Sequence, residues 1–190
     1  MRRILVLALS VCGLCSCGVL PPASPSVIQH DLGSGFVRLL REPLGLRAVT
    51  VSASPMLAGL AMHYRTADQP TVRGIYAFNR WAAPPAVLVE QAAVRLLPLD
   101  PGGRCRLSIV MADFILEVDA AGRGEAVIAS NLRLTRDDRP AVLTRSLDVR
   151  VPVAAVQPAL AAQGLREAVG VLADQTADWL AGDPRGFCRD

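Results

Sequence analysis

Three segments in the first half of the chain have the residue pattern of β-strands. They cover residues 46–51, 60–65 and 72–78, where β-branched residues or alternating apolar positions predominate. The polar residues 66–70 fit a hairpin loop between the second and third segments. In the second segment, His63 falls on the face opposite the apolar residues. We therefore expect His63 on a strand surface and not in a catalytic role.

The spacing of apolar residues becomes helical in two later segments. Residues 86–97 place apolar side chains on one face, directly after Pro84 and Pro85, and the first turn of a helix tolerates proline. Residues 158–181 carry a longer apolar stripe, and Gly182 follows in the position typical of a helix end. The sequence therefore predicts two main helices.

Between these helices, residues 104–153 predict three strands joined by tight turns at 120–124 and 135–140. The apolar phase of the first of these strands switches near Met111, which indicates a β-bulge. The element order is strands, helix, three strands, helix. It favours an α+β domain with an antiparallel or mixed sheet of about five to six strands and two helices packed on it.

The N-terminus has the features of an export signal. A positive pair, Arg2 and Arg3, precedes an apolar run that is too short to span a bilayer. The following Leu14-Cys15-Ser16-Cys17 resembles a bacterial lipobox, in which the last cysteine is acylated and becomes the new N-terminus. We expect a signal peptide at 1–16, lipidated Cys17 with a flexible tether to residue 35, and one domain at 36–190. The alternative is an ordinary secretory signal.

The residues after Cys17 predict where the protein is held. The lipobox resemblance implies a sorting convention in which an aspartate after the cysteine retains the protein at the inner membrane, and Gly18 stands there instead. We therefore expect the periplasmic face of the outer membrane. The tether is rich in Pro, Ser and Gly, and His30 within it is interpreted as a solvated linker residue.

Two cysteines, Cys105 and Cys188, remain for the mature domain. An exported protein lies in an oxidising compartment, so a disulfide between them is permitted and would tie the C-terminal tail to a central strand. The alternative is a buried thiol at Cys105 and an exposed one at Cys188. We favour the disulfide.

Composition and charge argue against several classes of function. The formal net charge is +3 and falls to +1 once Arg2 and Arg3 leave with the signal, and aromatic residues make up only 4%, so no nucleic-acid partner is expected. Two histidines offer little for a metal site. Three carboxylates could share one strand face, namely Asp113, Glu117 and Asp119. A solvated face explains them better than acid–base chemistry. We expect no enzyme activity and no cofactor besides the covalent lipid.

Two short motifs resemble those of a known family. Met62-His63-Tyr64-Arg65 and then Ile75-Tyr76-Ala77-Phe78-Asn79-Arg80-Trp81-Ala82, followed by Pro84-Pro85 at a helix start, are similar to the PqiC-like family of ABC-type transport auxiliary lipoproteins. Ala83 replaces the glutamate usual in that family. The resemblance extends over most of the mature chain through the order of elements.

This resemblance implies a non-catalytic accessory subunit of an MCE/ABC-type lipid transport system that spans the envelope. The expected partners are the membrane, through the N-terminal lipid, an MCE-domain protein and ABC or related inner-membrane subunits; a homo-oligomer is compatible with such a role. Partner-binding candidates are Arg80, Trp81, Pro84 and Tyr76, although Trp81 fits core packing between sheet and helix better. The alternative is a structural or lipid-binding envelope lipoprotein without a transport role.

Overall fold

The computed structural model describes residues 25–36, 43–182 and 186–188. The predicted signal peptide, the lipidation site Cys17 and the first part of the tether lie outside the described residues. Their assignment stays a prediction from the sequence.

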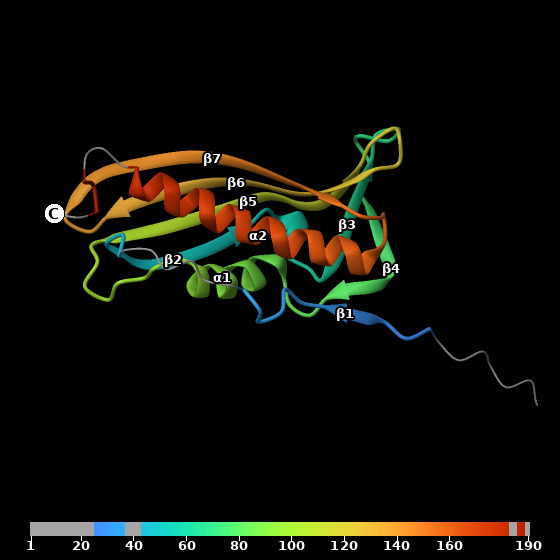
Figure 1. The fold of residues 1–190 in the computed structure, drawn as a ribbon, viewed down its shortest axis with the longest axis horizontal. Helices are drawn as coiled ribbons and strands as arrows, with labels where there is room; N and C mark the ends of the chain where they lie inside the picture. Colours follow the sequence, from blue (N-terminus) through green and yellow to red (C-terminus); the bar gives the residue numbers. More distant parts are fainter. Residues whose placement is uncertain (1–24, 37–42, 183–185, 189–190) are drawn as a thin grey trace, which may run out of the picture.

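Seven strands of the described chain form one mixed sheet. Figure 1 shows how they are arranged. The order is β1-β4-β3-β5-β6-β7, and β2 pairs with the part of β5 that β3 does not reach. The pairs β1–β4, β2–β5 and β3–β5 are parallel, and the remaining neighbours are antiparallel. The strands are β1 Ile28–His30, β2 Leu46–Ala53, β3 Ala61–Thr66, β4 Gly74–Trp81, β5 Cys105–Val118, β6 Gly124–Arg136 and β7 Arg139–Val153.

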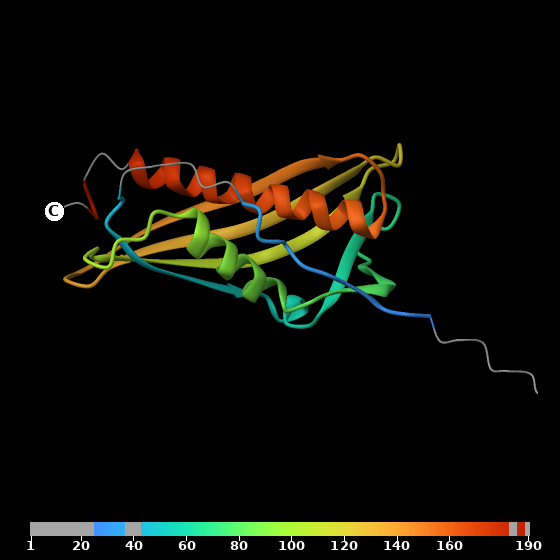
Figure 2. The ribbon, with the colours of Figure 1, turned by 60° about the horizontal axis from the view of Figure 1, so that its bottom comes forward.

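Two helices, α1 Pro85–Leu96 and α2 Pro158–Ala181, lie on the same side of the sheet (Figure 2). α1 packs on β2, and α2 packs on β5, β6 and β7. Alternate residues of the long strands face the helices and form the core; on β6, Ala126 and Ile128 are examples. A short 3-10 helix, η1 Pro55–Leu57, follows β2. The predicted α+β class with a mixed sheet and two helices is confirmed.

The bulge predicted near Met111 is present in β5. Its register with β6 shifts between Met111 and Asp113, so one extra residue, Ala112, reverses the alternation of faces. Met111 and Phe114 are therefore both in the core although they are three residues apart. The change of apolar phase in the sequence was a reliable signal of this bulge.

The structure differs from the predicted tether at residues 28–32. Ile28–His30 form β1 beside the end of β4, and Leu32 is only 3% exposed in the core. The folded part described by the structure therefore begins at Ile28 and not at residue 36. His30 is correspondingly no linker residue, because its Nε2 lies 2.8 Å from Asn79 Oδ1 on β4. Three paired residues among prolines and serines are too few to show a strand period.

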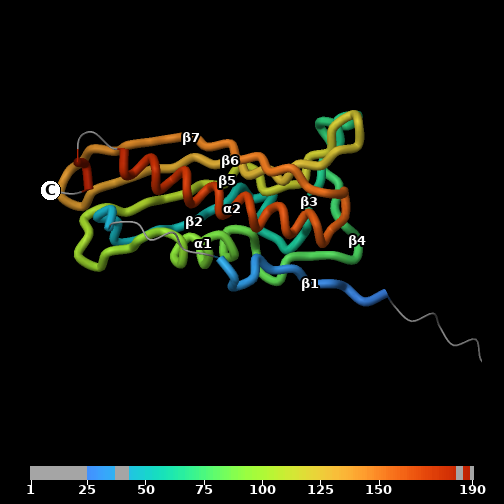
Figure 3. The backbone as a smooth tube through the Cα atoms, in the orientation of Figure 1, coloured from blue at the N-terminus to red at the C-terminus, as the bar shows by residue number. Residues whose placement is uncertain are grey.

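The two ends of the described chain lie at opposite ends of the molecule. The trace in Figure 3 places β1 and the β3–β4 hairpin at one end and residues 186–188 at the other. Among the described residues, no helix combines the length and the apolar content needed to cross a bilayer.

Candidate functional site

The residues that carry the family resemblance form the β3–β4 hairpin and the start of α1. Tyr64 and Tyr76 pack across this hairpin with their ring centroids 5.1 Å apart. Gly74 lies opposite Tyr64 in the register, and a Cβ at Gly74 would overlap the Tyr64 ring. Glycine at this position therefore lets the tyrosine lie flat over the neighbouring strand.

Trp81 is a core residue. Its side chain is 1% exposed, and its ring centroid lies 5.2 Å from that of Phe114 on β5. The structure thus excludes Trp81 as a direct partner contact and agrees with the alternative favoured from the sequence, a residue that fills the space between sheet and helix. Its burial fixes the end of β4 just before Pro84, which is the N-cap residue of α1.

The other three partner-binding candidates differ in exposure. Arg80 is exposed and has no ion-pair partner among the described residues, whereas Pro84 and Tyr76 are half-buried. The Tyr76 hydroxyl is buried without a hydrogen-bond partner in the described part of the chain. Burial raises the pKa of this hydroxyl. Arg80 is thus the member of the set most able to contact another molecule.

Sequence reasoning missed two exposed apolar side chains on β4. Ile75 is 59% exposed and Phe78 is 51% exposed. Their signal was present in the sequence: residues 74–78 read Gly-Ile-Tyr-Ala-Phe, without the polar alternation of a strand that has one solvated face. This stretch also lies at a margin of the sheet, because β1 pairs only with Asn79–Trp81.

A network of ion pairs lies on the face of the sheet that the helices leave uncovered. Glu117 on β5 accepts hydrogen bonds from Arg65 Nη1 on β3 at 2.9 Å and from Arg150 Nη1 on β7 at 2.8 Å. Asp113 pairs with Arg73 and lies 3.8 Å from Arg65 Nη2. Alternating charges thereby join β3, β5, β7 and the β3–β4 loop, which contains Arg73, across the solvated face.

Only two of the three carboxylates that were expected to share a face belong to this network. Asp119 instead bonds within the β5–β6 turn, where it accepts hydrogen bonds from the backbone of Ala121 and Arg123 at 2.9 Å and pairs with the Arg123 guanidinium at 2.7 Å. These bonds lower the pKa of the Asp119 carboxyl. Asp113 and Glu117 are each paired with arginines, as expected of a solvated face.

A cavity of about 600 Å³ opens between the ends of the β3–β4 and β5–β6 hairpins. Three arginines and three carboxylates contribute to its lining, so the opposite charges balance. Its charged lining residues are Arg65, Glu117, Asp119, Arg123, Glu125 and Arg150. The described residues contain no group of three or more His, Cys, Asp or Glu side chains able to hold a metal ion.

His63 is half-buried, not simply a surface residue as its strand parity predicted. Its Nδ1 is buried without a hydrogen-bond partner in the described chain. Burial, and then the nearby charge of Arg73, lower the pKa of the imidazole, which favours its neutral form.

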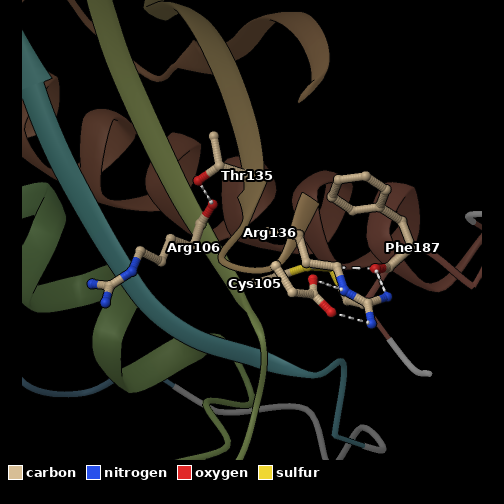
Figure 4. The surroundings of a disulfide bond; sticks show 7 residues. Cys105, Arg106, Thr135, Arg136 and Phe187 are labelled. Atoms are coloured by element: carbon tan, nitrogen blue, oxygen red, sulfur yellow. Dashed lines mark hydrogen bonds and ion pairs between the residues drawn. A yellow bond between two sulfur atoms is a disulfide. The ribbon is translucent and has the colours of Figure 1, made fainter. Parts of the chain in front are cut away.

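The predicted disulfide between Cys105 and Cys188 is present, at the end of the molecule away from the hairpin. Arg136 lies beside it with its guanidinium buried, and Figure 4 shows Arg136 directed at the Phe187 carbonyl. Arg136 Nη1 donates to Phe187 O at 2.8 Å, and its Nε donates to Asp138 at 2.6 Å. The C-terminal tail is thus held by a covalent bond and by a charged hydrogen bond.

Comparisons with known proteins establish the fold alone. No protein-family model matches the chain, and no curated protein matches it either. The crystal structure of protein XCC0632 from Xanthomonas campestris, described with the family model DUF330, superposes with a TM-score of 0.64 at 18% identity, over 82% of this chain and 91% of that one. A crystal structure of an uncharacterized protein gives a TM-score of 0.61 at 14% identity, over 82% of this chain and 99% of the other.

Proposed function

We propose that this protein is a lipid-anchored accessory subunit of an MCE/ABC-type transport system, held at the periplasmic face of the outer membrane. It acts as a docking component and not as a catalyst. The predicted lipobox at Cys17 supplies the anchor, and the motifs of the β3–β4 hairpin supply the likeness to ABC-type transport auxiliary lipoproteins. The proposal is of a PqiC-like role.

The observation that carries the proposal is the surface of β4. The strand whose sequence resembles the family exposes Ile75 and Phe78, and Arg80 next to them has no ion-pair partner among the described residues. Apolar side chains flanked by an unpaired arginine are typical of protein contact surfaces, where arginine and aromatic residues are enriched.

The cavities favour docking over lipid carriage. The cavity of about 600 Å³ is lined by six charged side chains, which an acyl chain would have to desolvate without compensation. The apolar cavity between α1, α2 and β5 has a volume of only about 10 Å³, far too small for a lipid tail. The lipid-binding alternative therefore has less support than a docking role.

The experiment that tests the proposal is co-purification of the full-length protein from native membranes in mild detergent, with identification by mass spectrometry. We expect an MCE-domain protein or an ABC subunit in the eluate. Arg80→Glu should abolish this co-purification because it reverses the exposed charge, whereas the control Arg133→Glu, at an exposed position on β6, should not. An eluate with only other outer-membrane or peptidoglycan-associated proteins would instead support a structural lipoprotein.

A further inference from the structure

We infer that residues 74–78 of β4 receive an extended segment of the partner protein, which adds to the sheet as a further strand. This stretch is called the β4 edge below. The inference rests on the proposed function, because it takes the partner to be a component of the transport system. It adds the mode of binding and the chemistry of the segment that is recognised.

The β4 edge has hydrogen-bonding groups that the fold does not use. β4 is bordered by β3 on one side and by β1 on the other, and β1 covers only Asn79–Trp81. In the described part of the chain, no strand lies beside residues 74–78 on the β1 side. Such a row of backbone N–H and C=O groups is a template for another strand.

The edge strand β7 and the β4 edge differ in how they resist strand addition. β7, at the far edge, carries residues that hinder pairing, namely two prolines and three arginines: Pro140, Pro152, Arg139, Arg145 and Arg150. Prolines and charged side chains are the usual protection of an edge. The β4 edge contains neither, and it exposes Ile75 and Phe78 instead. β7 thus has the usual protection, whereas the β4 edge has neither prolines nor charges and departs from regular pairing with β3 between Ile75 and Arg80.

The chain's own N-terminal segment is a poor occupant of this edge. β1 runs parallel to β4 with Ile28 opposite Asn79, so continuing the register would place Pro25 opposite Tyr76. The paired strand nevertheless begins at Ile28, and Pro25 has no backbone N–H to donate. Further prolines at positions 21 and 22 oppose a longer strand in the same way. A strand from another molecule therefore suits this edge better than residues 25–27 of the chain itself.

The geometry of the edge indicates the chemistry of the segment. β1 occupies the place beside Asn79–Trp81, so the added strand is short, on the order of five residues. The pairing of β4 with β3 is irregular between Ile75 and Arg80. Ile75 and Phe78 are both exposed, so apolar residues of the incoming segment would gain burial against them. Arg80 follows the edge and favours a carboxylate at the adjoining end of the segment. The recognised segment is extended and apolar, with an Asp or Glu at one end.

The test is site-specific photo-crosslinking of the full-length protein in cells. A benzoylphenylalanine replaces Ala77, which is exposed between Ile75 and Phe78, and a control carries it at Val142, which is 39% exposed on β7. We expect Ala77 to crosslink to an apolar, acidic-ended segment of an MCE-domain protein or an ABC subunit, and Val142 not to do so. Combining Ile75→Lys with Phe78→Lys should lower the yield at least about tenfold, a loss of about 1.4 kcal/mol in binding, while Val142→Lys should leave the yield from Ala77 unchanged.

Other outcomes would overturn the inference. These are a crosslink from Ala77 to a second copy of this chain, a crosslink to lipid, or an undiminished yield in the double lysine variant. If an MCE or ABC component co-purifies but crosslinks only from other positions, the β4 edge is not the binding site and the proposed function stands. If no such component co-purifies, the proposed function fails, and the inference fails with it. Both lysines replace exposed side chains, so an unchanged thermal midpoint will verify that the variant is folded.

Discussion

Loss of the Cys105–Cys188 disulfide is expected to be the most destabilising change that leaves the packed core intact. The bond joins residues 83 positions apart, so it closes the chain from β5 to the C-terminal tail into one long loop. The entropy formula for loop closure gives about 4.5 kcal/mol at 25 °C for a loop of this length. The variant Cys188→Ser removes the bond while Cys105, which is fully buried, keeps its volume.

The tail has a second attachment, which lowers the expected loss. Arg136 Nη1 donates to Phe187 O at 2.8 Å, and the Phe187 side chain is buried. These contacts still hold the tail against the sheet when the disulfide is absent. We therefore expect Cys188→Ser to lose between about 2 and 4.5 kcal/mol of unfolding free energy. Combining Cys188→Ser with Arg136→Leu should loosen the tail further and exceed the loss of either change alone.

Urea unfolding of the lipid-free chain from residue 18 measures this loss. If the unfolding free energy falls by about 2 kcal/mol per M urea, the urea concentration at the unfolding midpoint should fall by about 1 to 2 M. The reduced wild-type protein is the matched control and should unfold at the same midpoint as Cys188→Ser. If the midpoint of Cys188→Ser stays within about 0.3 M of the oxidised wild type, the tail does not constrain the unfolded chain and the reasoning from loop entropy is wrong.

Three further predictions concern the hairpin and the charged face. Gly74→Val should cost about 1–3 kcal/mol, because its side chain overlaps the Tyr64 ring, and a fall in thermal midpoint without loss of secondary structure would show this. Glu117→Gln should cost about 1–2 kcal/mol at low salt, because it removes the acceptor of two arginines, and the difference from wild type should shrink in 1 M NaCl; an equal loss at both salt concentrations would contradict an electrostatic origin. His63 has a folded-state pKa lowered from 6.5, so the unfolded chain binds its proton first and stability should fall as the pH drops below about 6.5. His63→Phe should flatten this part of the stability–pH curve, and an unchanged curve would show that other groups cause it.

The long periodic elements could be predicted from the sequence. α2 spans Pro158–Ala181 as predicted, because its apolar stripe runs for six turns between a proline and a glycine. The three strands of residues 105–153 followed from their alternation, and even the bulge after Met111 left a readable change of phase. These features are local, so the chain's own pattern determines them.

The features that depend on distant contacts could not be read in the same way. β1 exists because Ile28–His30 pair with β4, about fifty residues later in the chain. A strand of three residues is too short to show an alternation of apolar and polar positions in the sequence. The partners of Glu117 lie 52 and 33 residues away, so the sequence shows a carboxylate on a strand but not the arginines that bind it. The burial of Trp81 likewise depends on Phe114, a residue of another strand.

The position of β1 links the proposed anchor to the proposed docking surface. Ten residues separate Cys17 from Ile28, and a fully extended chain of that length reaches about 40 Å at most. A lipid on Cys17 would therefore hold the β4 edge within about 40 Å of the membrane, while the disulfide-bound tail lies at the opposite end of the molecule. Pro25, which the β1 register would place opposite Tyr76, has no backbone N–H to donate to β4. One short sequence thus limits the distance of the edge from the membrane and also leaves that edge open for a partner strand.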